Sequence, residues 1–66
     1  MKKQPKYEKG DIVEFIVNDV HKIGKIMVVD SWNSCYRHIE YDILVDEENM
    51  LYKHFSENLI IRKVDP

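Results

Sequence analysis

The stretch IEYDILVD, residues 39–46, alternates apolar and acidic side chains with a period of two residues. Successive side chains of a β-strand point to opposite faces of the sheet, so this pattern is typical of a half-buried strand. The apolar residues that share one face are Ile39, Tyr41, Ile43 and Val45. The acidic residues that share the other face are Glu40, Asp42 and Asp46. Leu44 is the exception, because it places an apolar side chain among the acidic ones.

Other segments carry similar strand signals, and polar or glycine-containing turns separate them. They are residues 11–17, 22–32, 50–55 and 59–64. Gly24 lies inside the second of these segments and predicts a bulge or a close approach of two backbones. No segment has the i, i+3, i+4, i+7 apolar spacing of a long helix, so the sequence predicts an all-β fold.

The break between the last two expected strands is very short. Only residues 56–58, Ser-Glu-Asn, interrupt the alternating pattern there. A single turn of 3-10 helix redirects a chain within so few residues without ending the sheet. Short strands in an open sheet leave exposed edges, whereas closure into a barrel removes them. We therefore expect a small five-stranded barrel with a short 3-10 turn before the last strand.

A chain of 66 residues makes one domain and hides only about 60% of the surface that its unfolded form exposes, so its core must be compact. Phe55 and Leu59 are expected to hold the two ends of the 3-10 turn. The full expected core is Val13, Phe15, Ile26, Val28, Tyr41, Ile43, Val45, Leu51, Phe55, Leu59 and Ile61.

Composition indicates the cellular compartment and the surface chemistry. Cys35 is the only cysteine, so no internal disulfide forms, as is usual in a reducing compartment. No membrane span or signal-peptide pattern is present, and we expect a cytoplasmic protein without membrane association. Residues 1–9 hold four lysines and Glu8, net +3, so the overall charge of −2 leaves −5 for residues 10–66. We interpret residues 1–6 as a flexible basic tail and residues 7–64 as the barrel domain.

Short motifs along most of residues 7–64 resemble those of small SH3-like barrels of bacteria and their phages or mobile elements, in the style of KOW and Tudor modules. They are Tyr7-Glu8-Lys9-Gly10-Asp11-Ile12-Val13, Gly24-Lys25-Ile26, Tyr41-Asp42-Ile43 and Phe55-Ser56-Glu57-Asn58-Leu59. The resemblance implies an SH3-like barrel that binds a partner and does not catalyse a reaction. The turn at residues 18–21 is too short for a polyproline groove, and the acidic tip at residues 46–48 lacks the aromatic residues of a Tudor cage.

Cys35 and His38 stand at C-x-x-H spacing, which is also that of two zinc ligands or of a nucleophile and its base. The other histidines, His21 and His54, lie in separate segments, and no second cysteine completes a zinc site. The acidic residues 46–48 lack the glycine and the ligand spread of a calcium loop. We therefore expect no catalytic residue, no metal site and no cofactor.

The irregular segment WNSCYRH, residues 32–38, favours contact with a partner, because Trp, Tyr and Arg are enriched at interfaces. Two interpretations of Trp32 stay open, a contact residue or a lid on the end of the barrel. Tyr52 and His54 are expected on the face opposite Leu51 and Phe55, where they extend the same surface. The expected partner-binding residues are Trp32, Tyr36, Arg37, His38, Tyr52 and His54.

Two functional hypotheses follow. The first is a non-catalytic protein-interaction module, in the form of a phage or mobile-element accessory protein that binds a host protein. The alternative is association with nucleic acid, in which lysines of the tail hold phosphates while Trp32 or Tyr36 stacks on bases. The lysines concerned are Lys2, Lys3, Lys6 and Lys9. The acidic body favours the first hypothesis, and homodimerisation through a strand edge stays open.

Overall fold

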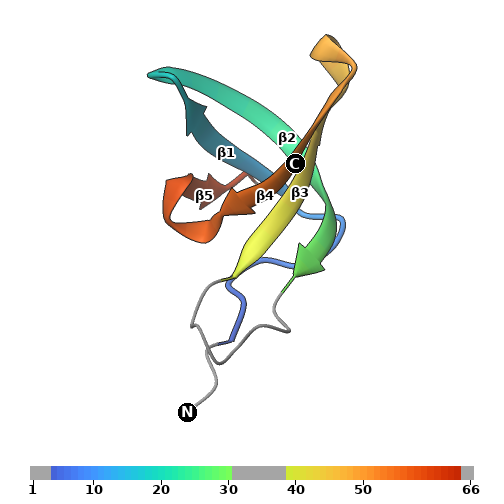
Figure 1. Ribbon diagram of the computed structural model, residues 1–66, viewed down its shortest axis with the longest axis vertical. Helices are drawn as coiled ribbons and strands as arrows, with labels where there is room; N and C mark the ends of the chain where they lie inside the picture. Colours follow the sequence, from blue (N-terminus) through green and yellow to red (C-terminus); the bar gives the residue numbers. More distant parts are fainter. Residues whose placement is uncertain (1–3, 31–38, 65–66) are drawn as a thin grey trace.

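A computed structural model describes residues 4–30 and 39–64 of the chain (Figure 1). The strands in this part are β1 (Ile12–Val17), β2 (Val20–Asp30), β3 (Glu40–Val45), β4 (Met50–Ser56) and β5 (Ile60–Lys63). The two 3-10 turns are η2 (Asp46–Glu48) and η3 (Glu57–Leu59). The all-β fold and the 3-10 turn before the last strand are therefore confirmed. No helix among the described residues has the length and apolar character to cross a membrane.

The long strand β2 organises a single antiparallel sheet of order β4-β3-β2-β1-β5. Its first half, from Val20 to Lys25, pairs with β1. Its second half, from Lys25 to Asp30, pairs with β3. Figure 1 shows β2 as a long curved strand between these two neighbours. Because one strand serves two partners in turn, the sheet bends along its length.

Residues in the left-handed backbone conformation form the turns of the β1–β2 and β3–β4 hairpins. Asn18 (φ 50°) and Asp19 (φ 66°) form a two-residue turn between β1 and β2. Positive φ at both positions is the type I′ geometry, whose twist matches that of the flanking strands. Asn49 (φ 52°) follows η2 and leads into β4. The sequence predicts both turns, although Val20 already belongs to β2 and the first turn is shorter than expected.

The sheet curls so that its two halves share one core. Phe15 of β1 lies with its ring centroid 4.9 Å from that of Phe55 and 5.6 Å from that of Tyr52, both on β4. Strands β1 and β4 are separated by β2 and β3 in the sheet, and a flat sheet would hold them roughly 14 Å apart. These ring contacts therefore exist only because the concave face wraps around Phe15.

Six of the expected core residues are buried: Val13, Phe15, Ile26, Tyr41, Ile43 and Val45. Phe55 is half-buried and packs against them. Four expected core residues are instead exposed: Val28 (48%), Leu51 (39%), Leu59 (50%) and Ile61 (44%). Two buried residues were missing from the expected set: Ile39 and Ile60. Except for Ile39, which belongs to the alternating stretch at residues 39–46, these errors lie on elements whose alternation is locally broken.

Two of these breaks are β-bulges. The β2–β3 register shifts between Ile26 and Val28, so Val28 turns away from the core. The β3–β4 register shifts opposite Asp42, where His54 has φ 55°. An extra residue at a bulge reverses the alternation beyond it. Tyr52 and Phe55 therefore both face the core although they are three positions apart in the chain.

The third break is η3 itself. Its N-cap is Ser56, whose hydroxyl accepts a hydrogen bond from the Asn58 backbone N–H. The Glu57 N–H donates to the Ile39 carbonyl over 3.1 Å, which attaches the turn to the start of β3. Because the turn includes Leu59, the first inward side chain of β5 is Ile60.

The close approach of β3 explains why the centre of β2 carries a glycine, Gly24. A Cβ atom there would lie 2.7 Å from the Leu44 carbonyl oxygen and 2.7 Å from Ile43 Cγ2. The close backbone approach predicted from the sequence is thus confirmed at Gly24, while the bulge lies further along β2.

Candidate functional site

A partly exposed aliphatic surface, in which Ile23 and Leu51 are exposed while Ile12 and Leu44 are half-buried, crosses the outer face of the sheet. Leu44 of β3 pairs directly with Leu51 of β4, and on its other side Leu44 pairs with Lys25, which pairs with Ile12. Ile23 lies diagonally beside this row on β2 and is 53% exposed. Neighbouring positions of this kind bring side chains on one face into contact. We call the residues Ile12, Ile23, Leu44 and Leu51 the aliphatic surface.

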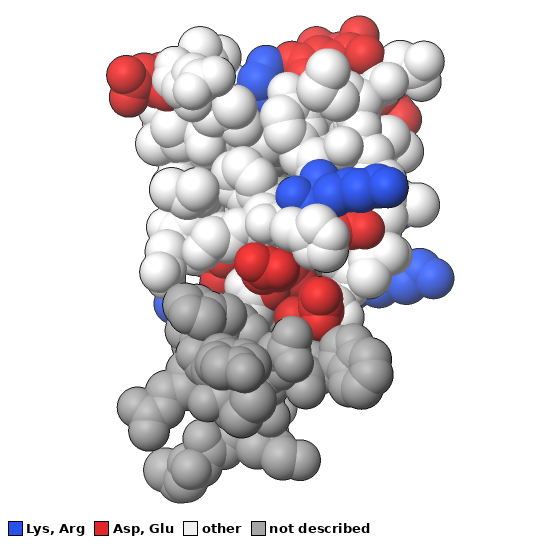
Figure 2. Space-filling model, in the orientation of Figure 1, with Lys and Arg blue, Asp and Glu red and all other residues white. Residues whose placement is uncertain are grey.

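The acidic turn η2 borders this surface. It carries Asp46, Glu47 and Glu48 in succession, all exposed. Figure 2 shows acidic side chains at the end of the molecule where η2 lies. Lys22 forms an ion pair with Glu48, while Asp46 and Glu47 have no ion pair to any described residue. The rim therefore keeps a net negative charge.

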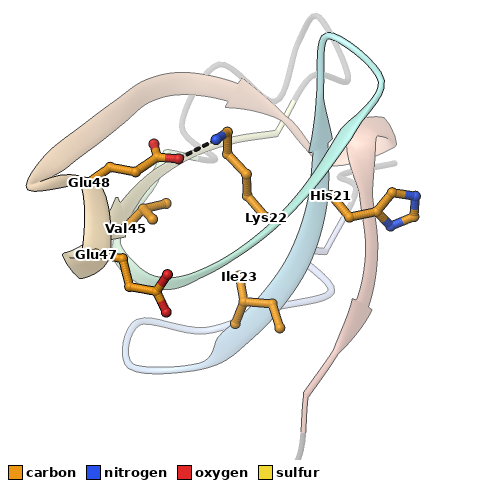
Figure 3. A pocket seen from close by; sticks show the side chains of 6 residues that line it. All are labelled: His21, Lys22, Ile23, Val45, Glu47 and Glu48. Carbon is orange, nitrogen blue, oxygen red and sulfur yellow. Dashed lines mark hydrogen bonds and ion pairs between the residues drawn. The ribbon is translucent and has the colours of Figure 1, made fainter.

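Two adjoining hollows join the aliphatic surface to the acidic turn. One, of about 180 Å³, is lined by Ile12, Ile23, Gly24, Lys25, Leu44, Asp46 and Glu47. The other, of about 270 Å³, is lined by His21, Lys22, Ile23, Val45, Glu47 and Glu48 (Figure 3). Ile23 and Glu47 line both hollows, so they lie at the centre of the combined depression.

Hydrogen bonds fix one wall of the larger hollow. Figure 3 shows the Lys22 ammonium extending to Glu48, and the Tyr52 hydroxyl donates to the other oxygen of Glu48 over 2.6 Å. The bond from Lys22 lowers the pKa of Glu48 below its ordinary value, and the bond from Tyr52 adds to this effect. The same Lys22–Glu48 bond raises the pKa of Lys22. Glu48 and Lys22 are therefore both charged at neutral pH and neutralise each other.

Of the predicted partner-binding residues, the structure describes only Tyr52 and His54. Trp32, Tyr36, Arg37 and His38 lie outside the described residues. The expected face of Tyr52 is wrong, because the bulge at His54 turns its ring toward Phe15 while Leu51 points outward. His54 is exposed on the other end of β4, with Nδ1 3.4 Å from a carboxylate oxygen of Glu40. Binding of a partner by these residues stays a prediction.

The aliphatic surface was not predicted as a site, although one signal pointed to it. Leu44 breaks the alternation of its strand, which places an apolar side chain on the solvent face. The sequence pattern predicts Leu51 in the core, because the bulge at His54 has no signature in the alternation. Ile23 lies on a strand whose register with β1 depends on the two-residue turn.

The described residues define a small all-β protein with a concave core, a partly exposed aliphatic surface and an acidic turn beside it. No family model, curated protein or solved structure matches the chain. What this surface binds must therefore be inferred from its own chemistry.

Proposed function

We propose that the protein is a non-catalytic protein-interaction module that binds a basic partner protein through the aliphatic surface and the adjoining acidic turn. The observation that carries the proposal is the pair of hollows that share Ile23 and Glu47. They place the exposed side chain of Ile23 next to the Glu47 carboxylate, which has no ion pair to any described residue. A partner that offers an apolar side chain flanked by lysine or arginine has the matching chemistry.

The apolar part of the surface supports binding rather than solvation. Single apolar residues scattered over a surface are ordinary, whereas contiguous ones mark interaction sites. Here Leu44 and Leu51 are direct cross-strand partners, and Ile12, Ile23 and Leu44 line one hollow. Covering this set by a partner removes apolar area from water, at about 25 cal/mol per Å² of gross gain.

The charge of the chain supports a basic partner. Residues 10–66 carry net −5, and Asp46 and Glu47 add local negative charge at the rim of the hollows. Complementary charge raises the rate of encounter and suppresses wrong partners. The body of the chain therefore attracts a basic protein surface and repels the phosphates of nucleic acid.

The fold that we propose for this module is the SH3-like barrel. The contacts of Phe15 with Tyr52 and Phe55 support it, because they join the two halves of the curled sheet. The η3 turn supports it as well, because it leads directly from β4, at one edge of the sheet, to β5, at the other. An accessory protein of a phage or mobile element that binds a host protein fits this small scaffold.

The experiment compares two surface variants of similar exposure in affinity capture from a bacterial lysate. Ile23→Ser removes the centre of the hollows, and Val20→Ser is its matched control, since Val20 is 52% exposed and lines neither hollow. We expect Ile23→Ser to weaken capture of the bound protein about tenfold and Val20→Ser to leave it unchanged. Capture should also weaken as salt rises, because screening removes the charge contribution.

Trp32→Ala separates the two contact regions. A partner that Ile23→Ser retains and Trp32→Ala loses binds through residues 32–38, which overturns the proposed surface. Capture of nucleic acid that nuclease releases would instead support the nucleic-acid hypothesis.

A further inference from the structure

Three metal-binding side chains converge at the end of the sheet opposite η2. They are Asp30, the last residue of β2, Glu40, the first residue of β3, and His54 on β4. One ligand atom of each lies within 4.8 Å of the other two. All three are at least partly exposed, so an ion can reach them from solvent. This cluster is independent of the surface to which we assign partner binding.

Strand register and a bulge bring the cluster together. Asp30 and Glu40 are direct cross-strand partners on β2 and β3. His54 has φ 55°, and its backbone N–H donates to Asp42 Oδ1 over 3.2 Å. Histidine is among the residues enriched at positive φ. The bulge therefore places the imidazole over Glu40, with Nδ1 3.4 Å from Oε1.

The charges of the cluster favour a cation. Like charges directly opposite each other on neighbouring strands destabilise a sheet. Among the described residues, no lysine or arginine forms an ion pair with Asp30 or Glu40. Other carboxylates of the described part do have such partners, for example Glu14 with Arg62 and Glu48 with Lys22. Figure 2 shows acidic side chains toward the end of the sheet where β2 finishes and β3 begins.

The donor set selects the kind of cation. Imidazole and carboxylate together suit divalent first-row transition metals, whereas calcium and magnesium prefer oxygen ligands alone. Tetrahedral zinc with bonds of about 2.1 Å holds its donors roughly 3.4 Å apart. The distance between His54 Nδ1 and Glu40 Oε1 is 3.4 Å, and a carboxylate oxygen of Asp30 lies within 4.8 Å of both donors.

We propose that Asp30, Glu40 and His54 form a binding site for a divalent transition metal, with zinc as the expected ion and water in the remaining position. Cys35 and His38, the pair with metal-ligand spacing in the sequence, lie outside the described residues and are not among the ligands that we propose.

Zinc titration of the full chain by calorimetry tests the site, with Cys35→Ser in every variant so that the thiol does not bind the ion. Asp30→Asn and Glu40→Gln keep the side-chain shape, and His54→Asn keeps a residue that tolerates positive φ. Each should weaken zinc binding by at least the roughly tenfold that loss of an outer-shell partner causes. His21→Asn is the matched control, since His21 is an exposed histidine that contacts Glu14 instead, and it should leave zinc affinity unchanged.

Ring resonances of the histidines in the Cys35→Ser chain give a readout that does not depend on the folding of the other variants. Zinc should shift the resonances of His54 and leave those of His21 in place. If the chain binds no zinc, or if zinc shifts only His21 or His38, then His54 and Glu40 form a plain ion pair and the proposal fails. Loss of zinc binding in His54→Asn has no bearing on Ile23, so the outcome is separate from that of the partner-capture experiment.

Discussion

The phenol of Tyr41 donates a 2.6 Å hydrogen bond to Oε2 of Glu57, and both residues are buried. The same carboxylate oxygen accepts the Lys6 backbone N–H over 3.0 Å, and the Tyr41 hydroxyl accepts the Tyr7 N–H over 3.4 Å. The ring of Tyr7 packs edge-on against Tyr41 with centroids 5.8 Å apart. The Glu57 carboxylate thus links η3 to Tyr41 in the core of β3 and to the segment that precedes β1.

Tyr41→Phe should destabilise the fold by about 1.5–3 kcal/mol, because it removes a hydrogen bond to a buried charged group without creating a large cavity. Urea denaturation measures the free energy of unfolding. Tyr52→Phe is the matched control, since it removes the same atom from an exposed bond to Glu48. Equal losses in the two variants would contradict a special role for the buried bond.

Alkaline pH should weaken the contribution of Tyr41. Burial, together with the hydrogen bond to Glu57, raises the pKa of Tyr41 above its ordinary value of 10.0. The stabilisation by Tyr41 is therefore complete while the pH is below the pKa of Tyr41 in the unfolded chain. It is lost as the pH rises above about 10, because the unfolded chain then releases the Tyr41 proton while the folded chain still retains it. The gap in unfolding free energy between the wild type and Tyr41→Phe should narrow from about pH 9 to about pH 11. A gap that stays constant would show that Tyr41 ionises equally in both states.

Gly24→Ala should destabilise the protein by about 1–3 kcal/mol, the usual effect of overpacking. The added Cβ would lie 2.7 Å from the Leu44 carbonyl oxygen, a backbone atom that no rotamer change can move away. Lys25→Ala, one position further along β2 and exposed, should change stability far less. Thermal unfolding of the two variants in parallel makes the comparison, and equal melting temperatures would refute the close approach.

Ile60→Ala and Ile61→Ala test which face of β5 meets the core. Ile60 is 7% exposed, so its truncation should cost about 2–5 kcal/mol through lost burial and cavity formation. Ile61 is 44% exposed, and its truncation should stay within about 0.5 kcal/mol. If urea denaturation shows the larger loss of stability for Ile61→Ala, then Ile61 faces the core, as the alternation counted from Leu59 predicts.

The sequence pattern predicts the strands of this fold but not every side-chain orientation within them. The strands were predictable because alternation in segments such as residues 39–46 follows directly from burial of one face. The faces beyond each bulge were not, because the inserted residue near Val28 or His54 leaves no trace in a period of two. The turn at η3 was predictable from its polar residues, but not the inclusion of Leu59 within it.

The candidate sites were harder to predict than the strands. Both depend on which residues of separate strands lie opposite each other. Asp30 and Glu40 meet through the β2–β3 register, which the alternation within either strand does not fix. The burial of Glu57 likewise depends on Tyr41, 16 positions away, and carboxylates are rarely buried.

In the sheet, β1 lies between β2 and β5, and its Val13 and Phe15 pair with residues of β5. During synthesis, the β1–β2 hairpin can form as soon as its two strands leave the ribosome, but one edge of β1 then waits for residues 60–63. A ribosome-bound chain that ends before Ile60 thus presents an open strand edge, which is a template for association with other chains. The order in which the strands are made therefore delays the completion of the core until β5 has been synthesised.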